Sequence, residues 1–279
     1  MYQGFYNLAS GMLTQSRNLN VVSNNMVNLQ TAGYKRDQMV SSTFQEEMLY
    51  RTGRRAKGTQ EPLATTSKIR TASRTYVNYD QGSYETTEGI YDFAIGGKGF
   101  FCIQTQNGVQ YTRNGSFAVD EEGYLVQGEN GRVLSTEGQA IRIENENFTV
   151  DAYGHITAPA QINADETDPE GTDPEDTGAG GADGNGGILD FGTIRLVDFA
   201  DYEQLHKEDN GLFSTNQAAT PVTGGETQIL WKTLEKSNVD MVSEMTAMMS
   251  SQRALQSAAQ VLKMYDTIMG KSASDVGRV

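Results

Sequence analysis

The two ends of the chain carry the same spacing of apolar residues, and no other feature constrains the fold as strongly. From Leu8 to Leu29, and again from Met241 to Met269, these residues step alternately by four and three positions. This is the spacing of the a and d positions of a coiled coil, and so narrow a stripe needs a partner helix rather than a sheet face. The stripe members are Leu8, Met12, Gln15, Leu19, Val22, Met26 and Leu29 in the first segment and Met241, Met245, Met248, Gln252, Leu255, Ala259, Leu262, Asp266 and Met269 in the second.

Local signals place the ends of both predicted helices. No proline lies before Pro62 or after Pro221, so long helices are permitted at both ends. The first helix should end near Gly33, which can take a left-handed cap conformation. Ser237 followed by Asp240 resembles a cap before the second helix. We therefore predict that the two helices pair as an antiparallel coiled-coil-like domain. The alternative is that each helix packs on its own against a globular core.

Between the helices the apolar pattern changes to a period of two, which indicates β-strands. Phe93–Ile95 and Phe100–Ile103 flank a glycine-rich turn and are predicted to form a hairpin. An antiparallel meander is expected over residues 91–160, with another strand at 192–199. Further turns of the meander are expected at Asn107-Gly108, Asn114-Gly115, Glu122-Gly123 and Asn130-Gly131.

The predicted fold class is α+β, with the terminal helices in one domain and an antiparallel β-rich domain between them. Residues 163–187 hold eight acidic residues, seven glycines and no basic residue. Such a segment cannot bury apolar surface, so it should be a surface loop. The predicted segments are an N-terminal helix over 1–35, an extended connector over 36–90, the β-rich domain over 91–200, a return connector over 201–233 and a C-terminal helix over 234–279.

Charge and cysteine content argue against several classes of protein. The net charge is −14, and nucleic-acid binding needs a basic face instead. The single cysteine, Cys102, excludes an intrachain disulfide and a cysteine-cluster metal site. No apolar run approaches the length of about 18 residues that a membrane-spanning helix needs. The N-terminus has neither a basic nor an apolar signal region, so a cleaved secretory signal is not expected.

No residue pattern predicts catalysis, cofactor binding or a metal site. His155 and His206 are the only histidines, and both lie in segments where solvated or packed histidines are expected. The glycines around Lys98 lack the spacing of a phosphate-binding loop, and the acidic segment lacks the EF-hand pattern. Two other classes of function remain as alternatives. One is a secreted adhesin or calcium-binding module that uses the acidic segment, and the other is a hydrolase that uses a histidine.

Three motifs resemble those of the flagellar rod and hook protein family. One ends the predicted N-terminal helix, and another precedes and enters the C-terminal helix. The third, over Phe93–Phe101 and Tyr111–Phe117, is typical of rod members. Ser23 and Leu255 stand where the family usually has an alanine and an aromatic residue. The motif residues at the two ends are Asn24, Asn25, Asn28, Thr31, Gly33, Tyr34, Lys35, Leu234, Glu235, Ser237, Asn238, Val239, Gln252 and Arg253.

The resemblance implies a structural subunit of the bacterial flagellar basal-body rod and no enzymatic activity. It implies that the stripes form an assembly seam, through which copies build a helical tubular axial structure that crosses the periplasm or cell wall and transmits torque. The implied partners are copies of the chain, other rod and hook subunits, and the flagellar type III export apparatus, which would export the chain without a cleaved signal peptide. No cofactor, nucleic acid or membrane span is implied. A hook-type subunit of the same family is the alternative, and both the proximal-rod and the distal-rod branch fit.

Overall fold

The computed structural model describes residues 2–51, 61–159, 188–208, 210–222 and 227–277. The acidic segment predicted at 163–187 lies outside the described residues. The chain divides into two compact units, one formed by Met1–Gly82 with Lys236–Val279 and the other by Ser83–Glu235. We call the first the helical unit and the second the β unit. The two helices and the antiparallel strands confirm the α+β class.

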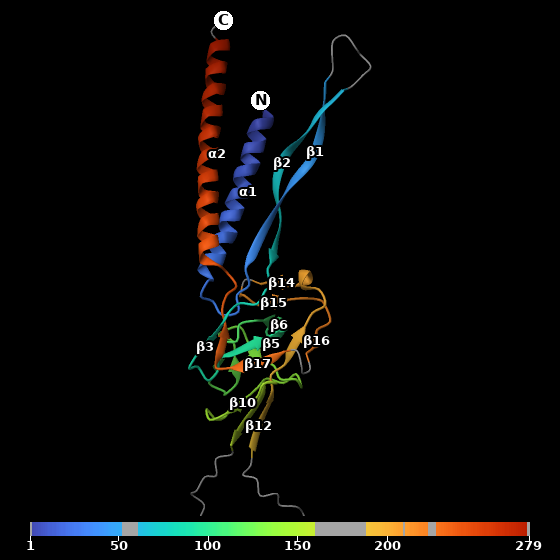
Figure 1. Cartoon of the computed structure of the whole chain (residues 1–279), viewed down its shortest axis with the longest axis vertical. Coiled ribbons are helices and arrows are strands. Elements are labelled where there is room, and N and C mark those ends of the chain that lie inside the picture. Colours follow the sequence, from blue (N-terminus) through green and yellow to red (C-terminus); the bar gives the residue numbers. More distant parts are fainter. Residues whose placement is uncertain (1, 52–60, 160–187, 209, 223–226, 278–279) are drawn as a thin grey trace, which may run out of the picture. The chain divides into compact units, whose positions relative to one another are not determined.

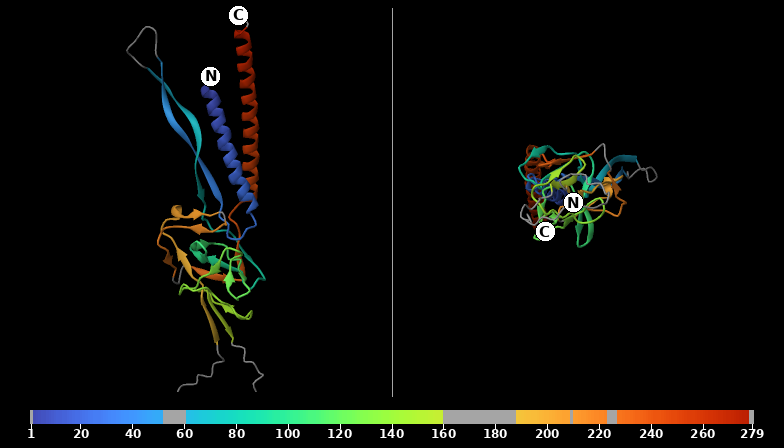
Figure 2. Two further views of the ribbon diagram at one scale, coloured as in Figure 1. Left: turned by 180° about the vertical axis from the view of Figure 1, so that it is seen from behind. Right: turned by 90° about the horizontal axis from the view of Figure 1, so that it is seen from below.

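The helical unit contains two long helices, α1 (Tyr2–Val27) and α2 (Met241–Val276). Within this unit α1 lies between α2 and a two-stranded hairpin (Figures 1 and 2). After α1 the chain turns, and Gly33 adopts a φ of 67° there, which is the left-handed conformation that glycine accepts without strain. Asp240 caps α2, because its side chain accepts hydrogen bonds from the backbone N–H groups of Val242 and Ser243.

The hairpin of the helical unit consists of β1 (Asp37–Arg51) and β2 (Glu61–Val77), which pair in antiparallel fashion. From the sequence we expect an extended connector over 36–90. Within that range, β1 and β2 instead pair with each other, and the sequence does not indicate this pairing. This hairpin lies against α1 and forms a two-stranded sheet of its own, so it is not packed between other sheets. Its sequence can therefore lack the alternation by which ordinary strands are recognised.

The β unit is built from short strands. Their bounds are β3 (Tyr84–Thr86), β4 (Phe93–Gly96), β5 (Phe100–Thr105), β6 (Gly108–Thr112), β7 (Ala118–Val119), β8 (Leu125–Val126), β9 (Arg132–Val133), β10 (Thr149–Val150), β11 (His155–Pro159), β12 (Ile188–Thr193), β13 (Leu196–Asp198), β14 (His206–Lys207), β15 (Phe213–Ser214), β16 (Thr220–Pro221), β17 (Gln228–Trp231) and β18 (Thr233–Glu235), with a 3-10 helix at Tyr202–Gln204. The largest sheet has the order β14-β15-β6-β5-β9-β8-β7, and β13 joins it through β5 and carries β16. Smaller sheets are β10-β11-β12, β17-β4 and β18-β3.

Strand pairing supports three of the predicted turns and corrects two others. Hairpins turn at Gly108, Gly123 and Gly131, where φ is 112°, 87° and 155°. The hairpin predicted around the glycines after Phe93–Ile95 is wrong, because β4 pairs with β17 and not with β5. Gly115 does not join a hairpin either. Its carbonyl accepts a hydrogen bond from the N–H of Phe93 at 2.9 Å, and a Cβ at Gly115 would overlap the Phe93 carbonyl oxygen.

Residues 201–233 also differ from the expected return connector. They supply the 3-10 helix and the strands β14, β15, β16 and β17 to the β unit. These strands are two to four residues long, which is too short for a period to be recognised. The core of the β unit consists of buried aliphatic and aromatic side chains from across its sequence, among them Phe93, Ile95, Phe101, Ile103, Phe117, Leu125, Val133, Ile141, Ile156, Ile194, Leu212 and Ile229.

Cys102 in β5 is 1% exposed, and burial raises the pKa of its thiol to about 12. At pH 8 only about one thiol in ten thousand is then the reactive thiolate. We expect iodoacetamide at pH 8 to leave Cys102 unmodified in the folded chain and to alkylate it in urea, as measured by intact-mass spectrometry. The folded pKa lies above the unfolded one of about 8.5. The neutral buried thiol therefore stabilises the fold fully below that pH, and its contribution is lost as the pH rises toward 12. Rapid alkylation without urea would contradict this placement.

Candidate functional site: a polar junction and an uncovered helix face

The two histidines lie on separate strands of the β unit. His155 Nε2 lies 2.8 Å from Asp190 Oδ1, and both side chains are on the surface. The hydrogen bond from His155 is the main cause that lowers the pKa of Asp190. His206 is exposed on β14. Within the described ranges, no group of three or more His, Cys, Asp or Glu side chains can hold a metal ion. None of the described helices has the length and hydropathy to cross a membrane.

Four of the terminal motif residues, Asn25, Tyr34, Lys35 and Asn238, meet in one place, where α1 ends, α2 begins and the hairpin starts. Asn25 is its centre and is 1% exposed. Its Nδ2 donates to the carbonyl oxygen of Asp37 at 2.8 Å and to Glu244 Oε2 at 3.3 Å. Its Oδ1 accepts from the N–H of Asp37 at 2.9 Å and from the Tyr34 hydroxyl at 3.3 Å. One buried amide therefore satisfies four groups. We call this cluster the polar junction; its members are Asn25, Tyr34, Lys35, Arg36, Asp37, Asn238 and Glu244.

Glu244 brings a buried charge into the polar junction. Its side chain is 1% exposed, and its Oε1 accepts a hydrogen bond from Arg36 Nε at 2.6 Å. Arg36 is partly open to solvent, with a third of its side chain exposed. A carboxylate in this position is stable only while its charged and hydrogen-bonding partners remain. The first turn of α2 is thereby tied to the segment that follows α1.

Asn238 ties the chain segment before α2 to the residues that flank the two strands of the hairpin. Its Oδ1 accepts from the backbone N–H of Arg36 at 2.7 Å, and its Nδ2 donates to the carbonyl oxygens of Asn78 and Asp80 at 2.8 and 2.9 Å. Lys35 is buried, and its Nζ donates to the same Asp80 oxygen at 2.9 Å. Residues about 160 to 200 positions apart in the sequence thus form one network.

The remaining motif residues have smaller roles or face solvent. Thr31 donates to Asn28 Oδ1, and Asn28 donates to the Asn24 carbonyl oxygen, so both stabilise the turn after α1. Burial, followed by the charge of Asp37, raises the pKa of Tyr34 far above its ordinary value. Ser237 Oγ accepts from the N–H of Val239, which is buried. Leu234 and Glu235 belong to the β unit, where Glu235 forms a buried ion pair with Arg113. The side chains exposed to solvent are Asn24, Gln252 and Arg253.

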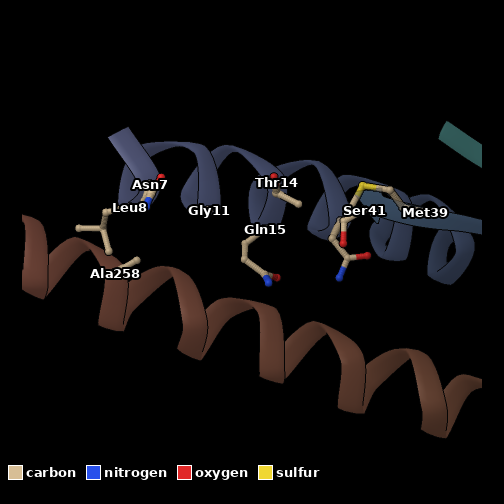
Figure 3. A pocket seen from close by; sticks show the side chains of 9 residues that line it. Asn7, Leu8, Gly11, Thr14, Gln15, Met39, Ser41 and Ala258 are labelled. Carbon is tan, nitrogen blue, oxygen red and sulfur yellow. The ribbon is translucent and has the colours of Figure 1, made fainter. Parts of the chain in front are cut away.

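Beyond the polar junction, α1 and α2 contact each other in antiparallel alignment. Asn25 bonds to Glu244, Asn18 Nδ2 donates to Ser251 Oγ at 3.0 Å, and a Cβ on Gly4 would lie 2.7 Å from the Tyr265 hydroxyl. Partners therefore run in opposite directions along the two helices. Beside this contact, residues of α1, α2 and β1 line a cavity of about 290 Å³ (Figure 3). Its lining residues are Asn7, Leu8, Gly11, Thr14, Gln15, Asn18, Met39, Ser41 and Ala258.

The stripe residues fall differently on the two helices. On α1 all predicted stripe members that lie within the helix are buried or half-buried, as is Leu29 after it. On α2 the half-buried members are Met248, Leu255, Leu262 and Met269, whereas Met241, Met245, Gln252, Ala259 and Asp266 are exposed. The other covered positions each lie one residue before a stripe member, at Glu244, Ala247, Ser251, Ala254, Ala258 and Tyr265. Small and polar residues therefore share this contact with part of the apolar stripe.

α2 consequently carries apolar side chains that nothing in the described chain covers. Val242 is 72% and Met264 62% exposed. We call these side chains the outer face of α2; its members are Met241, Val242, Met245, Met249, Val261, Met264 and Ile268. An apolar surface of this extent on one helix marks an interaction surface. Two of these residues, Met241 and Met245, belong to the apolar stripe predicted from the sequence.

Comparison with known proteins found three matching family models. Residues 5–35 match the family described as "Flagella basal body rod protein". Residues 94–158 match "Flagellar hook protein FlgE/F/G D1 domain", and residues 232–275 match "Flagellar basal body rod FlgEFG protein C-terminal". The first and third models include most of the polar junction.

Curated relatives match along almost the whole chain. The flagellar basal-body rod protein FlgF of Caulobacter vibrioides is 32% identical over 276 residues, covering 97% of this chain and 95% of the relative. The flagellar basal-body rod protein FlgG of Bacillus subtilis is 28% identical, with 96% and 97% covered. The flagellar hook-basal body complex protein FlhO of Bacillus subtilis is 28% identical over the full length of both chains.

Proposed function

The chain belongs to the family of flagellar basal-body rod proteins, and we propose that it works there as a structural subunit that joins its own copies through the terminal helices. In this proposal α1 and α2 pair as an antiparallel coiled-coil-like domain, and their stripes form the assembly seam. Many copies build a helical tubular axial structure that transmits torque. The family is a structural one, and we infer no enzymatic role for this member.

The near absence of charge on α1 and on residues 245–262 of α2 supports burial in an assembly. Arg17 is the only charged residue from Tyr2 to Gln30, and Arg253 is the only one from Met245 to Leu262. On a protein surface that stays in water, about a quarter to a third of the residues are usually charged. The chain as a whole has a net charge of −14, so these two segments contain far fewer charged residues than the rest of the sequence. Their exposed surface suits amide, hydroxyl and apolar neighbours such as another copy of the same helices.

The outer face of α2 supplies the driving force in this proposal. Burying a methionine or valine side chain fully contributes about 1.5 to 3 kcal/mol, and the outer face has seven such apolar members. α1 already covers the opposite side of α2 within the same chain. A second helix on the outer face then makes a contact between two different surfaces of identical subunits. Contacts of this kind, when they do not close into a ring, build a helical polymer.

We further infer the partners and the place of assembly from the family. The partners are copies of this chain, other rod and hook subunits, and the flagellar export apparatus, which would export the chain without a cleaved signal peptide. The rod then lies in the periplasm or cell wall. The names of the matched relatives support a rod rather than a hook subunit, which stays the alternative within the family. The proposed domains are a helical one, which contains the helix-bearing segments 1–35 and 234–279, and a β-rich one, which contains the segment 91–200.

A deletion of the gene in the native bacterium tests the proposal. We expect the deletion strain to lack hooks and not to swim, because later axial structures assemble onto the rod. Returning the intact gene should restore both hooks and swimming. The matched control returns a chain that lacks residues 163–187; its recovery would argue against an adhesin or calcium-binding role of the acidic segment. Complete hooks and normal swimming in the deletion strain would overturn the proposal.

A further inference from the structure

Arg253 is a motif residue whose side chain does not contribute to the described fold of the single chain. It is exposed and makes no ion pair with any part of the chain that the structure describes. Around the axis of α2, at about 100° per residue, it lies within about 60° of Val242, Met249 and Met264. All three belong to the outer face and are strongly exposed. Arg253 is therefore a cation in the middle of an apolar surface.

Covering the outer face would bury this guanidinium, and a buried charge is costly unless it is paired. The partner must then bring a carboxylate. α1 has no acidic residue. On α2, the oxygens of the capping residue Asp240 already accept backbone hydrogen bonds, and Glu244 is engaged in the polar junction. Of the other two acidic residues of α2, Asp275 lies in the last turn, and Asp266 is exposed and has no ion pair within the described residues.

The positions of Arg253 and Asp266 fit contacts on two flanks of the same helix. Asp266 follows Arg253 by 13 residues, which places the two side chains about 140° apart around the axis at 3.6 residues per turn. A helix that touches an identical, roughly parallel neighbour on each side needs contacts near 180° apart. The same 13 residues correspond to about 20 Å along the axis, at about 1.5 Å per residue.

We propose that Arg253 of one copy forms an ion pair with Asp266 in α2 of the next copy, and that this pair sets the axial register of the assembly. The inference rests on the proposed assembly through the terminal helices. A single polar pair inside an apolar helix contact fixes register because every shifted alignment leaves a buried charge alone. Neighbouring α2 helices are then displaced by about 20 Å along their axes.

Charge exchange in the full-length chain tests this pair. Arg253→Asp and Asp266→Arg should each lower the polymer formed by the purified protein at least roughly thirtyfold, as measured by sedimentation, because each leaves like charges in contact. The double variant Arg253→Asp/Asp266→Arg should recover to within about threefold of the parent. The matched control Arg17→Asp/Asp266→Arg has the same charges and should stay blocked. Circular dichroism of each variant confirms that the helices form.

The outcomes separate this inference from the assembly proposal on which it rests. A parent chain that polymerises while both single variants polymerise equally well overturns the ion pair alone. The ion pair is also overturned if both single variants are blocked and the Arg253→Asp/Asp266→Arg double variant does not recover. It is overturned as well if the Arg17→Asp/Asp266→Arg control recovers. A parent chain that never polymerises overturns the assembly proposal, and the pair with it. Helical reconstruction of parental polymers gives an independent check, since a displacement far from about 20 Å contradicts the register.

Discussion

Replacing Met249 by aspartate raises the protein concentration needed for polymerisation at least about a hundredfold. Met249 is 52% exposed on the outer face of α2, so the change should leave the separate chain intact. In the polymer, however, it puts a carboxylate into an apolar helix contact, and one turn away it also draws Arg253 from the partner proposed for it. Sedimentation over a series of protein concentrations measures the effect.

The matched control for this prediction is Met249→Leu, which keeps an apolar side chain of similar volume and should polymerise like the parent. Fluorescence of the single tryptophan, Trp231, reports whether the β unit stays folded. Polymerisation of the aspartate variant at the parental concentration would show that the outer face is not part of the assembly contact.

The second large effect is expected at the polar junction, where Asn25→Ala removes an amide that serves four groups. The backbone N–H and carbonyl of Asp37, the Tyr34 hydroxyl and the Glu244 carboxylate each lose a partner. Each buried group without a partner costs about 1 to 3 kcal/mol, and some relax toward water. We expect the helical unit to lose at least about 3 kcal/mol, which lowers its urea midpoint by about 1 to 3 M.

Circular dichroism at 222 nm follows this transition, because both long helices belong to the helical unit. Asn24→Ala is the matched control: Asn24 is the neighbouring motif residue, but its side chain is exposed, so its removal should shift the midpoint little. Equal midpoints for Asn25→Ala and the parent would mean that the junction contributes nothing to stability. In that case the motif residues would need another explanation.

The helices and several turns were predictable because short-range chemistry determines them. The four-three spacing and the absence of proline predict the long terminal helices. Gly33 takes the expected left-handed conformation, although α1 ends at Val27, and Asp240 caps α2. Glycines at tight turns, such as Gly123 and Gly131, mark hairpins that do form. These features depend on residues that are close together in the sequence, so a local sequence pattern is enough to predict them.

The pairing of distant segments could not be predicted in the same way. Asn25 and Glu244 are 219 residues apart, and no periodicity relates them. β4 pairs with β17 because the chain crosses between sheets, although the glycines after β4 suggest a local hairpin. Ser251 and Ala258, which the predicted stripe leaves out, lie on the covered side of α2 together with the stripe members Met248 and Leu255. The spacing of apolar residues predicts that a helix has a narrow contact stripe. The exact side of the helix that is covered also depends on small and polar residues, which this spacing leaves out.

Electron cryomicroscopy of assembled rods, with helical reconstruction at side-chain resolution, tests the central claim most directly. We expect α1 and α2 of each copy to remain paired, with the outer face of α2, including Val242 and Met249, buried against a helix of a neighbouring copy. A reconstruction in which these side chains face solvent, while copies are joined through their β units alone, would contradict the account.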